Sequence, residues 1–230
     1  MKKRDVLSNR VVYAIASSLI LAFMLTGCTT AGPTYSGWLK TDYAKLTEDP
    51  EHEGSMTWIE SNEVIKNYNK VMIDPVVVYI DPDIGEVDQR ADQEVIKKIT
   101  AYMRDTLVKE FSKGYDVVDE PGKNVVRIRM AITSVLLTDK ELTALNYIPV
   151  ALVLTAAGEA TGIRDNLAVI NMEGEVLDSL TGRRIALVVQ RKALETGVQS
   201  TEELKAKDVY PTLDYWAKKA KKKFDRAHGK

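Results

Sequence analysis

Cysteine and histidine are almost absent from this sequence, which has one cysteine and two histidines among its 230 residues. A single cysteine cannot form an internal disulfide, so a folded domain would be held together by its core. Cys28, His52 and His228 are also too few and too widely spaced for a Cys/His metal site or a Cys–His nucleophile. A G-x-S-x-G motif and a glycine-rich phosphate loop are both missing. We therefore expect no metal, no cofactor and no catalytic residue.

The sequence also has no excess of basic over acidic residues. The first 27 residues hold four of the 32 basic and one of the 33 acidic residues, which leaves residues 28–230 with a net charge of −4. A nucleic-acid-binding domain would carry a basic surface, so this class of partner is excluded. The hydrophobic content of 45% is ordinary for a globular protein. The length remaining after residue 27 suits one domain of substantial size.

The N-terminus has the pattern of a lipoprotein signal peptide. A basic leader precedes an uncharged run from Val11 to Thr26, which is shorter than the roughly 20 residues of a membrane-spanning helix. The run ends in Leu25-Thr26-Gly27-Cys28. This order of a branched apolar residue, two small residues and cysteine matches the lipobox, in which the peptidase recognises the first three and the thiol of Cys28 accepts the lipid. A transmembrane anchor with an incidental cysteine is the alternative.

The residue after the cysteine gives an expectation for the membrane. Thr29 follows Cys28, and the absence of an aspartate at this position favours sorting to the outer membrane. Several acyl chains on one N-terminus bind a bilayer far more strongly than a single chain does. We therefore predict a protein that is lipid-anchored on the periplasmic face of the outer membrane. Its expected partners are the membrane, through the lipid, and another envelope protein; the oligomeric state stays open.

Residue patterns divide the chain into four parts. Residues 1–27 form the signal peptide, 28–36 a tether, 37–69 an N-terminal arm and 70–228 the folded domain. For the domain we predict an α+β fold in which a largely antiparallel sheet has two helices packed on one face. The expected order is β-α-β-β-insert-β-β-α. Its elements are a strand over 70–80 broken or edge-placed at Pro75, a helix over 88–113, strands over 115–119, 126–133, 168–175 and 184–193, a hairpin turn at 178–183 and a helix starting near Pro211.

Several short motifs carry a resemblance to a known family. They are Ser36-Gly37-Trp38-Leu39 with Asp42-Tyr43, the run Lys70-Val71-Met72-Ile73-Asp74-Pro75-Val76, and the hairpin from Asp178 to Gly182. With these the sequence resembles a group of Gram-negative envelope lipoproteins known only as a domain of unknown function. The resemblance implies an envelope location and the α+β layout, with no activity to carry over. The order of strands and helices is also loosely similar to periplasmic domains of curli-secretion-type and transport-auxiliary lipoproteins.

The stretch from Leu142 to Gly162 is apolar and rich in small residues. Pro149 and the polar positions disfavour a membrane span, so two interpretations remain. The stretch either packs across the sheet as core or forms an exposed apolar element that docks a partner or a membrane. The side chains that we expect to dock in the second case are Tyr147, Val150, Val153 and Leu154.

Two charged segments allow a structural and a functional interpretation. Four carboxylates in the segment 81–88 could ligate calcium, although Pro82 and the position of Gly85 favour a solvated turn before a helix. Five lysines within 218–223 could bind anionic lipid or cell-wall polymer, although their spacing favours the wet face of a helix.

Taken together, these patterns predict a non-enzymatic binding or scaffolding module of the envelope. The alternative is an accessory subunit of a secretion or transport assembly that docks through 142–162, and an enzyme is the third hypothesis.

Overall fold

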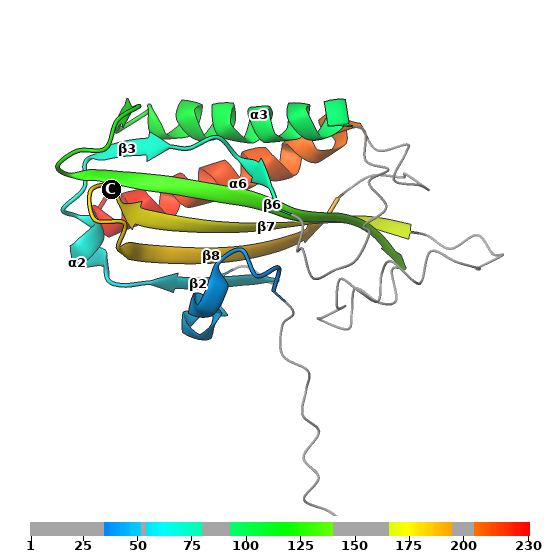
Figure 1. Cartoon of the computed structure of the whole chain (residues 1–230), viewed down its shortest axis with the longest axis horizontal. Helices are drawn as coiled ribbons and strands as arrows, with labels where there is room; N and C mark the ends of the chain where they lie inside the picture. Colours follow the sequence, from blue (N-terminus) through cyan, green and yellow to red (C-terminus); the bar gives the residue numbers. More distant parts are fainter. Residues whose placement is uncertain (1–34, 52–53, 80–92, 140–165, 195–204) are drawn as a thin grey trace, which may run out of the picture. The chain divides into compact units, whose positions relative to one another are not determined.

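The computed structural model describes residues 35–51, 54–79, 93–139, 166–194 and 205–230, which build one mixed sheet with helices. In sheet order the strands run β1-β2-β8-β7-β6-β3-β5, and β4 pairs with β6 (Figure 1). The pairs β1–β2, β2–β8, β8–β7 and β7–β6 are antiparallel. The pairs β6–β3, β3–β5 and β4–β6 are parallel. The strands are β1 (Thr47–Glu48), β2 (Ser55–Ile59), β3 (Lys70–Ile73), β4 (Val77–Val78), β5 (Asp116–Val118), β6 (Val125–Asp139), β7 (Asn166–Asp178) and β8 (Arg184–Ala193).

Two long helices, α3 (Gln93–Phe111) and α6 (Ala206–Ala227), cover one face of the sheet. Each has apolar residues at helical spacing, and these side chains are buried against the strands. The helices also contact each other, because Tyr102 stacks on Tyr210 with ring centroids 3.7 Å apart and Phe111 meets Phe224 edge to face. This core confirms the predicted α+β class with both helices on one side. It includes Met103, Leu107, Phe111, Ile170, Met172, Ile185, Leu213 and Trp216.

The predicted strand over 70–80 is split into β3 and β4 at Asp74-Pro75-Val76. Proline lacks the amide hydrogen that a strand donates to its neighbour, so the pairing cannot run through Pro75. β3 pairs with both β5 and β6, whereas β4 pairs with β6 alone and exposes Val77 and Val78. The interruption expected at Pro75 is therefore present, and it divides the run into two separate strands, of which β4 is exposed.

The hairpin between β7 and β8 forms as predicted at 178–183. The carboxylate of Asp178 accepts hydrogen bonds from the amides of Leu180 and Thr181, at 3.1 and 2.8 Å. Gly182 has φ +70°, a left-handed conformation that favours glycine. Beside this turn the register shifts between Val176 and Leu177, so β8 accommodates one additional residue, Ile185, as a bulge.

The sheet begins earlier in the chain than the expected order proposed. Residues 47–48 and 55–59, which the sequence pattern placed in the arm, form β1 and β2, and β2 pairs with β8 over its whole length. A short helix, α2 (Asn62–Ile65), follows, and its N-terminus is capped by the Ser61 hydroxyl, which accepts from the Val64 amide at 3.2 Å. Met56 and Trp58 pack on the outer side while Ile59 joins the main core, so β2 contributes apolar side chains to both faces of the sheet.

An ion-pair cluster fastens the β1–β2 hairpin to α6. The carboxylate of Asp49 lies 2.6 Å from Lys223 Nζ and 3.3 Å from Lys219 Nζ, and Lys219 Nζ also donates to the Ser55 hydroxyl. Burial alone would raise the pKa of Asp49, but hydrogen bonds from Lys223 and the Glu51 amide, with the two lysine charges, lower this pKa to about 2. The same burial lowers the pKa of Lys219. Both side chains of the Asp49–Lys219 pair are almost wholly removed from water.

The lowered pKa of Asp49 predicts a specific loss of stability in acid. A depressed carboxyl pKa stabilises the fold fully above the unfolded-state pKa near 4, and the contribution disappears as the pH falls towards 2. The gap in free energy of unfolding between the wild type and Asp49→Asn should narrow by about 2 kcal/mol between pH 6 and pH 2. Urea denaturation at each pH measures it. Glu48→Gln, at the exposed neighbouring position, should show no narrowing; equal behaviour of the two variants contradicts the assignment.

Candidate functional site

Residues 35–46, here called the cover segment, lie on the outer face of the sheet, opposite α3 and α6. The segment consists of a turn at Gly37 and a 3₁₀ helix, η2 (Lys40–Lys45). Gly37 has φ +88°, and the Lys40 amide donates to its carbonyl at 2.9 Å. Leu39 is completely buried and packs with Leu46 and with Leu187 of β8. The cover segment thus forms a second, smaller core on the face that the helices leave open.

A buried carboxylate on β7, that of Glu173, holds the cover segment at both ends. Its Oε1 accepts from the Ser36 amide at 3.0 Å, and its Oε2 accepts from the Tyr43 hydroxyl at 2.5 Å. The same hydroxyl accepts from the Leu39 amide at 2.9 Å, so Tyr43 links the segment to itself and to the sheet. Burial and the adjacent Glu173 charge raise the pKa of Tyr43, which keeps the hydroxyl protonated as a donor.

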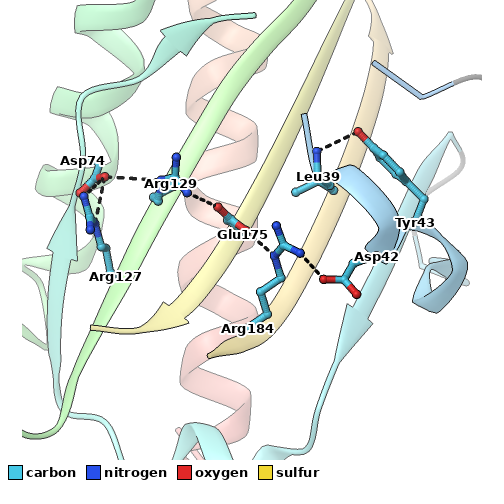
Figure 2. A network of polar contacts seen from close by, with 8 residues as sticks. All are labelled: Leu39, Asp42, Tyr43, Asp74, Arg127, Arg129, Glu175 and Arg184. Carbon is cyan, nitrogen blue, oxygen red and sulfur yellow. Dashed lines mark hydrogen bonds and ion pairs between the residues drawn. The ribbon is translucent and has the colours of Figure 1, made fainter. Parts of the chain in front are cut away.

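A row of alternating charges crosses the outer face from the cover segment to β3 (Figure 2). Its centre is Glu175, whose two oxygens each lie 2.6 Å from a guanidinium nitrogen, one of Arg184 and one of Arg129. Arg184 also contacts Asp42 in the cover segment. Glu175 is 4% exposed, so its charge is compensated by arginines and hardly at all by water.

The row ends at Asp74, beside the break between β3 and β4. Arg127 donates to the Asp74 carboxylate through Nε and Nη2, at 2.9 and 2.7 Å, and Arg129 Nε lies 3.7 Å from the same group. The hydrogen bonds to Asp74 raise the pKa of Arg127. At the other end, hydrogen bonds from Lys45 and then Arg184 lower the pKa of Asp42. Both arginines of β6 remain about 40% exposed, so this end of the row faces solvent.

Aromatic side chains of the cover segment extend the contact. Trp38 lies against the Arg129 guanidinium, 5.6 Å from the ring centroid, and Tyr35 stacks on Tyr43 at 4.2 Å. Burial, followed by the Glu173 charge, raises the pKa of Tyr35. On β2, Trp58 packs against the same cluster and Lys45 lies over its ring. The motif that carried the family resemblance is therefore the set of residues that attaches the segment to the sheet.

The polar groups of this site are suited to holding a segment in place. Glu175 and Asp74 are bound by arginines, and the two described hydrogen bonds of Glu173 come from donors of the cover segment. Within the described ranges, no group of three or more histidine, cysteine or acidic side chains is arranged to hold a metal ion. The same part of the chain contains no helix with the length and apolar character required to cross a bilayer.

Most residues that the sequence singled out lie outside the described ranges. These are the lipobox Leu25, Thr26, Gly27 and Cys28, the acidic segment 81–88, and the docking residues Tyr147, Val150, Val153 and Leu154. His228 is described, and its ring nitrogens contact the carbonyls of Phe224 and Tyr68, both at 2.8 Å. It is therefore a satisfied structural histidine at the end of α6.

The lysines of α6 are not a uniform wet face. Lys219 and Lys223 pair with Asp49, and Lys221 pairs with Asp225. Three of the five cations that could attract an anionic surface are thus neutralised by carboxylates of the same chain. The interpretation as a purely solvated face is wrong for Lys219, which is buried.

Sequence reasoning assigned 168–175 to a strand but gave no role to Glu173 and Glu175, so it missed the site that they form. The signal was present as two arginines at alternate positions of one strand, Arg127 and Arg129, and two glutamates at alternate positions of the next. In the antiparallel ladder Arg129 lies directly opposite Glu175. Opposed pairs of this kind stabilise neighbouring strands.

These features define an α+β domain with one helix-covered face and one face partly covered by its own N-terminal segment. The model of the family described as Protein of unknown function (DUF3313) matches residues 34–220, and the chain belongs to this family. The match begins at the cover segment and includes every strand of the sheet.

A curated relative and two solved structures are similar to the chain. The uncharacterized lipoprotein YdcL of Escherichia coli K12 is 26% identical over 184 residues, which are 78% of this chain and 81% of the relative. A putative neuraminyllactose-binding hemagglutinin homolog from Helicobacter pylori is 10% identical, with a TM-score of 0.38 and coverage of 79% and 94%. Lipoprotein GNA1162 from Neisseria meningitidis is 9% identical, with a TM-score of 0.32 and coverage of 68% and 98%. The predicted resemblance to lipoproteins of unknown function is confirmed by the family and by YdcL.

The central position of Glu175 predicts a clear effect on stability. Glu175→Ala leaves Arg129 and Arg184 without their shared carboxylate, and Arg184 is only 22% exposed. We expect a loss of about 2–3 kcal/mol in the free energy of unfolding by urea denaturation, less than for a fully buried pair because Arg129 can reach water. The exposed Glu120→Ala should stay within about 0.5 kcal/mol of the wild type. A loss for Glu175→Ala no larger than this would mean that the row of charges contributes no stability.

Proposed function

We propose that this protein is a lipoprotein of the bacterial envelope, anchored by lipid on Cys28 to the periplasmic face of the outer membrane. The lipobox Leu25–Cys28 at the end of an uncharged run is the observation that carries the proposal. Thr29 supports the choice of the outer membrane. The family match starts at residue 34, a few residues beyond the proposed cleavage point, and the curated relative is itself a lipoprotein.

Within the envelope we propose a non-enzymatic binding or scaffolding role, with another envelope protein as the partner. The described ionisable groups of the outer face are engaged with one another, as expected for a framework that presents a surface. Arg127 and Arg129 keep about 40% of their side chains exposed at the border of the cover segment, where Trp38 lies against Arg129. Arginine and tryptophan are the residues that most often dominate protein–protein interfaces.

Substitution of the lipobox cysteine tests the anchor. The full-length Cys28→Ser chain should keep its signal peptide, incorporate no radiolabelled palmitate and leave the outer-membrane fraction, because serine offers no thiol for acylation. Ser36→Ala, which retains the lipobox, should fractionate with the wild type. A Cys28→Ser chain that matures normally and still partitions with the outer membrane contradicts the proposal.

A second candidate is an accessory subunit of a secretion or transport assembly that docks through 142–162. The long ladder between β6 and β7 favours it, since pairing continues to Asp139 and Asn166 (Figure 1). In the described chain β4 accompanies β6 only as far as Ile132, and β8 accompanies β7 only from Val169. The described ends of this ladder, Asp139 and Asn166, flank the segment 140–165, so β6 and β7 would carry a docking element formed there.

Two aspartates distinguish docking from core packing. If 142–162 is a docking element, Val150→Asp with Val153→Asp should leave the melting temperature unchanged and abolish co-purification of the complex after mild detergent extraction. If the stretch is core, the buried charges should lower the melting temperature by many degrees. Val77→Asp, at a valine that is 45% exposed, is the matched control and should change neither. A double variant that behaves like this control contradicts the docking role.

A further inference from the structure

The cover segment is attached to the sheet by side chains. Among the described residues, no backbone-to-backbone hydrogen bond joins 35–46 to a strand, and the Lys40 and Leu46 amides donate to carbonyls of the segment itself. The strands beneath it do not depend on it, because β7 is hydrogen-bonded to β6 on one side and to β8 on the other. The segment can therefore leave without breaking the ladder.

The attached conformation also has a backbone cost. Lys40 has φ +58°, in the left-handed region that residues with a Cβ adopt only when their surroundings impose it. The contacts that impose it are the burial of Leu39 and the hydrogen bonds of Tyr43. Loss of these contacts would let the Lys40 backbone relax to an ordinary conformation. Attachment of the cover segment to the sheet therefore requires the strained backbone at Lys40.

Glu173 adds a second cost to the attached state. Its side chain is 2% exposed, and its described hydrogen-bond donors, the Ser36 amide and the Tyr43 hydroxyl, are both neutral and both belong to the cover segment. Among the described residues, no cation lies on either oxygen of this carboxylate, so these partners compensate its desolvation only in part. Departure of the segment would return this carboxylate to water.

We propose that the cover segment is a releasable strap. Its opening exposes part of the outer face of the sheet and lengthens the tether between the lipid anchor and the folded domain. When it is closed, it covers Glu173 and Leu187; when it opens, it exposes the Glu173 carboxylate beside the apolar side chain of Leu187 on β8. The effect on reach depends on the lipid anchor proposed above. The closed strap leaves residues 29–34 between Cys28 and the folded body, a span of at most ~20 Å, whereas the open strap leaves 29–46, up to ~60 Å.

Amide hydrogen exchange on the full-length chain tests the strap. The Lys40 and Leu46 amides, bonded within the segment, report its opening, and the Met172 amide in β7 reports unfolding of the sheet. In the wild type, Lys40 and Leu46 should exchange much faster than Met172, because the strap opens while the ladder stays intact. Tyr43→Phe removes the hydroxyl from Glu173 and should accelerate Leu46 exchange roughly 10- to 100-fold without changing that of Met172.

Two further variants make the result specific. Asp42→Asn weakens the contact with Arg184 and should also accelerate Leu46 exchange selectively. Asp116→Asn, the same change at an exposed position of β5, should leave all three rates unchanged. The proposal is wrong if Leu46 and Met172 exchange at one rate in the wild type, or if Tyr43→Phe leaves the Leu46 rate unchanged or accelerates both amides equally. Because exchange reads the segment itself, a chain without lipid gives the same answer, and failure of the anchor is a separate result.

Discussion

Burial of two carboxylates on one strand is the constraint around which the outer face is organised. Glu173 and Glu175 occupy alternate positions of β7, and both are almost completely removed from water on the face opposite α3 and α6, the two long helices of the described ranges. Charges in this position require donors close by. Arginines from β6 and β8 satisfy Glu175, and the N-terminal cover segment satisfies Glu173. Both carboxylates thus depend on hydrogen bonds and ion pairs from other parts of the same chain.

The two faces of the sheet follow different physical rules. On the inner face, α3 and α6 bury a large apolar core whose stability is roughly proportional to the area removed from water. On the outer face, a small apolar cluster and a row of ion pairs depend on geometry and on the exclusion of water. The helices therefore provide the large apolar core, whereas the ion pairs of the outer face add stability and also fix where the N-terminal segment lies.

The sequence predicted the inner face well because periodicity reports burial directly. The apolar positions of α3 and α6 and the Asp178–Gly182 turn follow from spacing and from the conformational freedom of glycine. It predicted the outer face poorly, because a glutamate in a strand is normally solvated and only tertiary contacts reverse this. Lys219 was misread for the same reason, since its partner Asp49 lies 170 positions earlier in the numbering. The break at Pro75 was expected as an interruption, yet its outcome as two strands required knowledge of the neighbours.

The bulge at Ile185 shows that the number of residues in β8, as well as their types, determines which side chains lie on the outer face. In a regular strand, residues 185 and 187 would share a face; here Leu187 packs with the cover segment while Ile185 belongs to the helix-side core. The additional residue changes the phase of β8, so Arg184 reaches Glu175 from the position next to a core isoleucine. In a strand of the same length without the bulge, Ile185 would lie on the outer face and the Arg184 guanidinium would emerge on the side occupied by α6, so the bulge keeps the isoleucine in the core and the arginine beside Glu175.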